Sequence, residues 1–97
     1  MSMKGAYSSA FHQESWDSFV KLFDEWYTQV PDEWKKRARL KGIPDDISRV
    51  LLCEMQEYAL KWMDMKVPAL GDQSPASYLN TEEGTNGLRA AIMQMPR

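Results

Sequence analysis

The stretch "YALKWMDMKVPALGDQSPASYLNTEEGTNGLRAAI", residues 58–92, decides how this chain folds in its C-terminal third. It joins the end of one predicted helix to two further helices through a segment of turn-forming residues. Pro68 cannot continue a helix, and Gly71 can adopt a positive φ angle, so the pair predicts a sharp reversal. Ser74 suits an N-cap and Pro75 suits a first helical position, which predicts a two-turn helix that ends near Asn80.

The last predicted helix begins after Thr81, which is a good N-cap residue. Gly84 and Gly87 both lie in its first half, where each costs about 1 kcal/mol relative to alanine. Two glycines at these positions therefore predict that another backbone approaches this part of the helix closely. Helical spacing places four apolar residues on the inner face of this helix: Leu88, Ala91, Ile92 and Met95.

Upstream of this stretch, apolar residues recur at helical spacing in two long segments, 13–30 and 44–66, and a short helix is expected between them at 31–42. Pro31 ends the first helix, and Gly42 can supply the left-handed residue that ends the second. Asp45 or Asp46 can cap the third. No segment alternates as a strand would. The sequence therefore predicts an all-α fold, a small single-domain bundle of four to five helices.

The predicted helical domain spans residues 13–97 and follows a flexible N-terminal tail, residues 1–12. A chain of 97 residues with 43% hydrophobic and 11% aromatic residues has room for one small core. Phe23, Leu51 and Trp62 are expected to be largely buried in it.

The sequence shows neither a secretory signal nor an apolar run of about 20 residues that could span a bilayer. The single cysteine cannot form an internal disulfide. We therefore expect a cytoplasmic protein without a membrane segment.

Side chains that could support catalysis are few and separated. The only histidine, His12, lies in the predicted tail, and the only cysteine, Cys53, lies beside an apolar helical stripe. One histidine and one cysteine cannot form a structural zinc site, and no glycine-rich phosphate loop is present. The sequence predicts no enzyme activity, no metal site and no cofactor.

A basic stretch, "KKRARLK", occupies the short second helix. It is open to three interpretations: a solvated helix face, a site for nucleic acid or another polyanion, or a site for an acidic protein. The net charge of −2 argues against specific DNA binding by the whole chain, because such domains are usually basic. The candidate polyanion-binding residues are Lys35, Lys36, Arg37, Arg39 and Lys41.

The ordered motif set in residues 58–92 resembles the C-terminal toxin-binding domain of the Xre/MbcA/ParS-like antitoxins of bacteria. That family has an "A-x-x-W" helix, a "P-x-L-G" turn, a "TP" helix start and a "T-x-x-G-x-x-x-V/L" helix. The chain departs from the pattern at Asp72, where a second glycine often follows "L-G". The matching residues here are Ala59, Trp62, Pro68, Leu70, Gly71, Ser74, Pro75, Leu79, Thr81, Gly84, Leu88 and Ile92.

The resemblance implies a proteinaceous antitoxin whose cognate toxin is of the RES type, an enzyme that consumes NAD. It also implies that the C-terminal tail reaches toward the active-site cleft of the toxin. Arg89 and Met93 lie four residues apart, on a helix face other than the inner one. We expect the partner to bind around Arg89, Met93, Met95 and Arg97.

The sequence leaves two alternatives to this antitoxin-like interaction module. One is a nucleic-acid-binding or transcription-regulatory protein that uses the basic helix at 35–41. The N-terminal half is too short for the complete DNA-binding domain that many family members carry, which argues against this function. The other is a structural homo-oligomer, of which a homodimer is the simplest form. It is considered because tryptophan, tyrosine and methionine are abundant in this chain, and these residue types are enriched at interfaces.

Overall fold

The computed structural model describes residues 11–95 of the chain. The described part contains six α-helices and two 3₁₀ helices and no named strand. Four of these α-helices have nine residues or more, which confirms the predicted all-α bundle. In chain order the elements are α2 (Gln13–Lys21), α3 (Asp24–Tyr27), α4 (Asp32–Leu40), α5 (Asp45–Met55), α6 (Tyr58–Trp62), η1 (Pro68–Leu70), η2 (Pro75–Asn80) and α7 (Glu82–Gln94).

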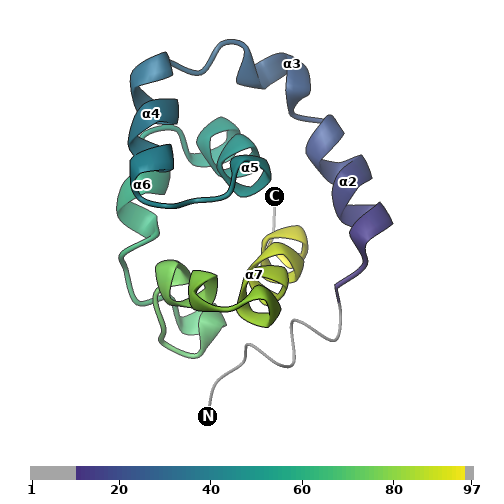
Figure 1. The fold of residues 1–97 in the computed structure, drawn as a ribbon, viewed down its shortest axis with the longest axis vertical. Coiled ribbons are helices and arrows are strands. Elements are labelled where there is room, and N and C mark those ends of the chain that lie inside the picture. Colours follow the sequence, from purple (N-terminus) through teal and green to yellow (C-terminus); the bar gives the residue numbers. More distant parts are fainter. Residues whose placement is uncertain (1–10, 96–97) are drawn as a thin grey trace.

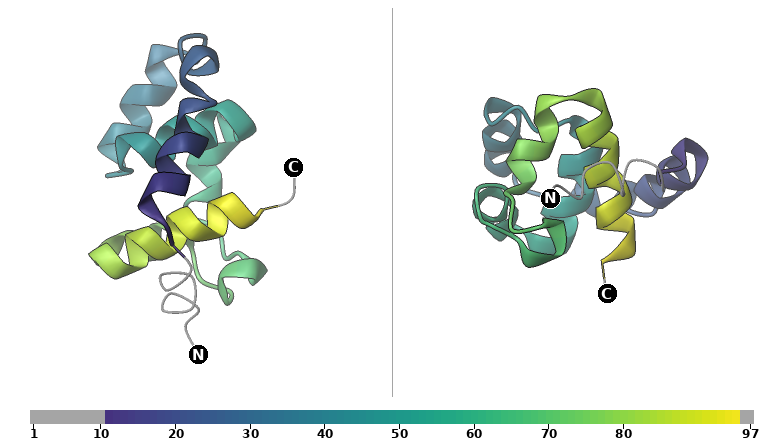
Figure 2. Two further views of the ribbon diagram at one scale, coloured as in Figure 1. Left: turned by 90° about the vertical axis from the view of Figure 1, so that its right-hand side faces the viewer. Right: turned by 90° about the horizontal axis from the view of Figure 1, so that it is seen from below.

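The helices surround α5, which contacts α2, α3, α4 and α6 (Figure 1). The connection between α3 and α4 lies at one end of the long axis, and η1 and η2 lie near the other end (Figures 1 and 2). η2 packs on α7, and α7 in turn contacts α2. The C-terminal unit is thus held against the N-terminal helices, and the two halves of the described chain share one body.

The helix predicted at 13–30 is split, which corrects the expectation of four continuous turns. α2 ends at Lys21, and the amides of Leu22 and Phe23 bond three residues back to Phe19 and Val20, which tightens the chain into a turn. The turn buries Phe23, as expected, but leaves Trp26 63% exposed although it is one of the apolar residues at helical spacing in this segment.

The helix predicted at 44–66 is also split, at Gln56. This residue has φ 56° and ψ −141°, a conformation that side-chain-bearing residues rarely adopt. α6 then ends at Trp62, six residues before Pro68, so the proline does not end the helix as predicted. Because of the break, Tyr58 is 50% exposed instead of joining the apolar stripe.

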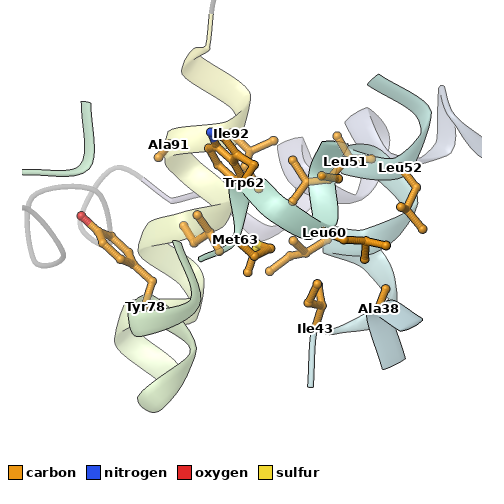
Figure 3. Packing of buried hydrophobic residues seen from close by; sticks show 14 of the residues in the cluster. Ala38, Ile43, Leu51, Leu52, Leu60, Trp62, Met63, Tyr78, Ala91 and Ile92 are labelled. Carbon is orange, nitrogen blue, oxygen red and sulfur yellow. The ribbon is translucent and has the colours of Figure 1, made fainter. Parts of the chain in front are cut away.

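The core runs through both halves of the described chain. Figure 3 shows α5, α6 and α7 contributing side chains to one continuous cluster. Leu51 and Trp62 are buried there, as the sequence predicted. Phe11, in the last part of the predicted tail, packs at its edge. Residues 1–10 of that tail, and Arg97 at the other end, lie outside the described residues.

Candidate partner-binding site

The reversal after α6 is built from backbone hydrogen bonds around η1. The Val67 amide donates to the Gln73 carbonyl at 3.1 Å, which closes the loop between them. Gly71 has φ 72°, as the sequence predicted. The buried hydroxyl of Tyr78 donates to the Leu70 carbonyl at 3.1 Å and fixes the loop to η2. Pro68 and Leu70 are the first and last residues of η1.

Two hydroxyl caps set the directions of η2 and α7. The Ser74 side chain accepts from the Ser77 amide at 3.3 Å, with Pro75 at the first helical position. The Thr81 side chain accepts from the Gly84 amide at 2.9 Å. Both caps confirm the sequence-based assignment, although the helix after Ser74 is 3₁₀ rather than α.

Gly84 lies where α7 passes close to the backbone of η2. A β-carbon at this position would overlap the carbonyl oxygen of Tyr78 and lie 3.0 Å from the Thr81 hydroxyl oxygen. Only glycine fits without a shift of the backbone, which accounts for its presence in a helix. Leu88, one turn farther along α7, is fully buried.

Asp72 occupies the position at which the resembling family often has a second glycine. Its φ angle is 60°, so the site requires a left-handed backbone. Aspartate tolerates this conformation better than most side-chain-bearing residues do. The departure from the family pattern is therefore compatible with the same turn.

A small apolar pocket of about 80 Å³ opens between the η1 loop and α7. Trp62, which is only 8% exposed, and Met95 both line it. The pocket is small enough to receive one side chain of a partner rather than a separate ligand. Its remaining lining comes from Val67, Ala69, Leu70 and Ala91.

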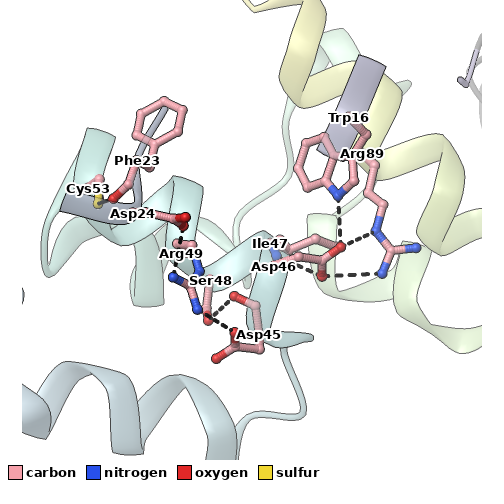
Figure 4. Close-up of polar contacts among 10 residues, drawn as sticks. All are labelled: Trp16, Phe23, Asp24, Asp45, Asp46, Ile47, Ser48, Arg49, Cys53 and Arg89. Carbon is pink, nitrogen blue, oxygen red and sulfur yellow. Dashed lines mark hydrogen bonds and ion pairs between the residues drawn. The ribbon is translucent and has the colours of Figure 1, made fainter. Parts of the chain in front are cut away.

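Arg89 is not free on an outer face. Its Nε donates to Asp46 at 2.9 Å and its Nη2 donates to the other oxygen of the same carboxylate at 3.3 Å (Figure 4). The indole of fully buried Trp16 donates to Asp46 at 2.8 Å. Asp46 thereby connects α2, α5 and α7.

From the sequence, Asp46 is expected only as a candidate cap of α5. No cap hydrogen bond from a side chain is made at the N-cap position, Pro44, although Asp46 accepts from the amide of Ile47. The connection to Arg89 was missed because the two residues are 43 positions apart and nothing local signals their contact.

Two of the other expected partner-binding residues lie near the C-terminal end of α7. Met93 and Met95 are half-buried and pack against the edge of the core. Met95 lines the apolar pocket, whereas Met93 does not and lies one turn after Arg89 on the same face of α7.

The basic helix is partly neutralised within the fold. Arg37 pairs with Glu57 at 2.8 Å and Lys41 pairs with Asp64 at 2.6 Å. Lys35 lies 3.9 Å from Asp32 and 4.3 Å from the ring centre of Tyr27. Lys36 and Arg39 form no ion pair within residues 11–95. The candidate polyanion-binding residues therefore offer less free positive charge than their sequence indicates.

The remaining candidate groups do not assemble into a reactive site. Cys53 is half-buried on α5, and burial raises the pKa of its thiol, which disfavours the reactive thiolate. His12 is exposed at the start of α2. Within residues 11–95, no group of three or more histidine, cysteine and acidic side chains could hold a metal ion. No described helix has the length and apolar character needed to cross a membrane.

Comparison with models of known protein families gives a match. The family model described as the antitoxin Xre/MbcA/ParS C-terminal toxin-binding domain matches residues 51–95. A search of curated proteins found no match, and a search of solved structures found none either. The matched segment contains the end of α5, all of α6, η1, η2 and α7, and the pocket between η1 and α7. The family resemblance indicated by the sequence is thus confirmed: residues 51–95 are similar throughout to the toxin-binding domain of these antitoxins.

Proposed function

We propose that this protein is an antitoxin that binds and neutralises a protein toxin, and that it does so without catalysis of its own. The single observation that carries the proposal is the family match at residues 51–95. In this segment the caps and the Gly84 contact hold the η1 loop and α7 in one arrangement. A rigid surface binds a partner at a lower entropic cost than a flexible one does.

We place the partner contact at the C-terminal end of α7 and the pocket beside it. Met93 and Met95 supply adaptable apolar contacts there, since methionine fits irregular surfaces. The pocket walled by Trp62 offers a recess for an apolar side chain of the toxin. Arg97 follows Met95 by two residues and remains part of the proposed contact. Arg89 supports the site indirectly, because it holds α7 to Asp46 and is not itself the main partner contact.

The cognate toxin is proposed to be of the RES type, on the resemblance of the motif set alone. A co-expression experiment tests this step. The protein is expressed together with a RES-type enzyme, and growth and cellular NAD are measured. Neutralisation predicts normal growth and NAD levels with this protein present, and loss of both without it. Depletion of NAD that this protein does not relieve would contradict the proposed function.

A matched pair of variants tests the proposed surface. Met95→Asp places a charge at the pocket and is expected to weaken toxin binding by about 10-fold or more, the size typical of a central interface residue. Gln94→Asp makes the same kind of change at the neighbouring exposed position and is the control. Unchanged binding by a folded Met95→Asp protein would move the site elsewhere, first to the exposed surface of α3 around Trp26.

A further inference from the structure

We propose that the apolar pocket between the η1 loop and α7 accepts one branched aliphatic side chain of the toxin, and that Ala69 and Ala91 set this size limit. The inference rests on the proposed function, since it names the partner group that this pocket takes. All six lining residues lie within residues 51–95, the segment that matches the toxin-binding domain of the family. The partner of that domain is therefore the occupant to which the pocket is assigned.

The pocket has a buried floor and a more open rim. Figure 3 shows Trp62 of α6 beside Ala91 of α7, and both residues line the pocket. The floor is made by the three lining residues that are buried: Trp62, Leu70 and Ala91. The rim is made by the lining residues that are half-buried or exposed: Val67, Ala69 and Met95. Because the floor belongs to the packed core, its shape is fixed before a partner arrives.

The chemistry of the lining selects an apolar occupant. No charged side chain lines the pocket, and its six side chains are an indole, a thioether and four aliphatic groups. A charged or strongly polar side chain placed there would lose its hydration without gaining a matching partner. An aliphatic group has no such cost, and its removal from water is favourable.

The volume of the pocket selects among apolar side chains. The pocket measures about 80 Å³. A dry apolar cavity of about 150 Å³ holds a benzene ring, and one water molecule takes up about 30 Å³ in the liquid. The pocket thus has roughly half the room of a cavity that holds benzene. The branched end of a leucine, isoleucine or valine fits this space, whereas an aromatic ring does not.

Two alanines keep this space open. Ala91 lies one turn before Met95 on α7, and Ala69 is the middle residue of η1. A larger side chain at either position would occupy volume that the partner side chain needs. Both alanines are thus specificity-determining residues. Ala69 is the better position for a test, because it is exposed and its replacement spares the core.

The size limit is tested on the free protein with two probes, xenon and benzene. Both bind in an apolar cavity of about 150 Å³, whereas only the smaller xenon atom suits this pocket. Xenon is expected to shift the NMR signals of the Ala69 and Ala91 methyl groups, and benzene is expected to leave them unchanged. The limit is overturned if xenon causes no shift or if benzene causes one. A xenon shift seen only after deletion of Pro96 and Arg97 also overturns the proposal, because the end of the chain would then be the occupant.

The occupant is tested with the RES-type toxin of the co-expression experiment, whose apolar residues, aromatic ones included, are changed one at a time to alanine. Ala69→Leu is expected to weaken binding of the unchanged toxin about 10-fold or more. It should bind more tightly to the toxin variant that lacks the aliphatic anchor, because the added side chain fills the space that the anchor leaves. A double-mutant cycle measures this coupling. Gln94→Leu adds the same side chain at an exposed position outside the pocket and should bind as the unchanged protein does.

The possible failures are distinguishable. If a folded Ala69→Leu protein binds the toxin as tightly as the unchanged protein does, the inference is overturned and the proposed function stands. Coupling to an aromatic residue of the toxin, or to none, has the same consequence. A dimer in sedimentation that Ala69→Leu dissociates would make a second copy the occupant and overturn the inference. If the unchanged protein does not bind the toxin at all, the proposed function fails and this occupant fails with it, whatever the xenon and benzene measurements show.

Discussion

At the scale of single residues, Gly84 shows how one missing side chain fixes the C-terminal unit. Gly84→Ala gains about 1 kcal/mol of helix propensity but must overcome overlap with the Tyr78 carbonyl. Overpacking of this kind typically costs about 1–3 kcal/mol, and here the neighbour is backbone, which cannot rotate away. We expect a net loss of up to about 2 kcal/mol, measured by denaturant unfolding. Gln94→Ala, at an exposed position of α7, is the control and should change stability by less than about 0.5 kcal/mol.

Gln56 adopts an unfavourable backbone conformation. Its φ of 56° with ψ of −141° suits glycine, and such conformations cost other residues about 1–3 kcal/mol. Gln56→Gly is therefore expected to raise the free energy of unfolding by about 1 kcal/mol, after allowance for the greater freedom of unfolded glycine. Thermal melting measures the gain. Gln56→Ala keeps the strain and should give none; equal gains from both changes would show that the side chain, not the backbone, is responsible.

At the scale of elements, the Asp46 carboxylate joins three helices. Its oxygens accept from Trp16 of α2 and Arg89 of α7, and Asp46 itself lies in α5. Asp46→Ala leaves the buried indole NH and a half-buried guanidinium without this partner. We expect a loss of about 2–4 kcal/mol, between the cost of an unsatisfied buried donor and that of a broken buried ion pair.

A neighbouring carboxylate provides the control for Asp46. Asp45 pairs with Arg49 at 3.1 Å but its side chain is 70% exposed, so Asp45→Ala should cost less than about 1 kcal/mol. Urea unfolding of both variants gives the comparison. Equal losses for the two would contradict the role assigned to Asp46.

The sequence predicted the C-terminal elements better than the central ones, for a physical reason. Pro68, Gly71, Ser74 and Thr81 act locally, through backbone angles and caps within a few residues, and local chemistry is visible in sequence. The break at Gln56 has no glycine or proline to signal it.

After that break, Leu60 of α6 and Met63 just beyond it are buried in the same core cluster as the residues of α5, so the break is tied to packing that no local residue signals. The pairing of Asp46 with Arg89 was equally invisible, since it depends on helix positions that only the complete fold defines. The exposed Trp26 follows from the turn at Phe23, which likewise carries no local signal.

At the scale of the whole molecule, the matched segment and the helices before it form one folding unit. The match starts at residue 51, inside α5, and buried core residues precede it. Those residues are Trp16, Phe23, Ala38, Ile43, Ile47 and Val50. A fragment of residues 51–97 therefore lacks six of the 18 buried hydrophobic residues, about a third of the core.

We expect the fragment 51–97 to be largely unfolded by circular dichroism, since the whole domain has only about 5–15 kcal/mol of stability to lose. The fragment 13–97 is the matched comparison and should keep the helical spectrum and cooperative melting of the full chain. Cooperative unfolding of 51–97 by itself would contradict the single-unit description.

The most direct test of the account is amide hydrogen exchange of the intact protein, alone and in complex with its co-expressed toxin. The proposed contact predicts new protection in the η1 loop and at the C-terminal end of α7, around Met93 and Met95. It predicts little change at the α3–α4 connection, which lies at the other end of the molecule. Protection confined to residues 24–34, with none at η1 or α7, would contradict the assignment of the toxin-binding surface.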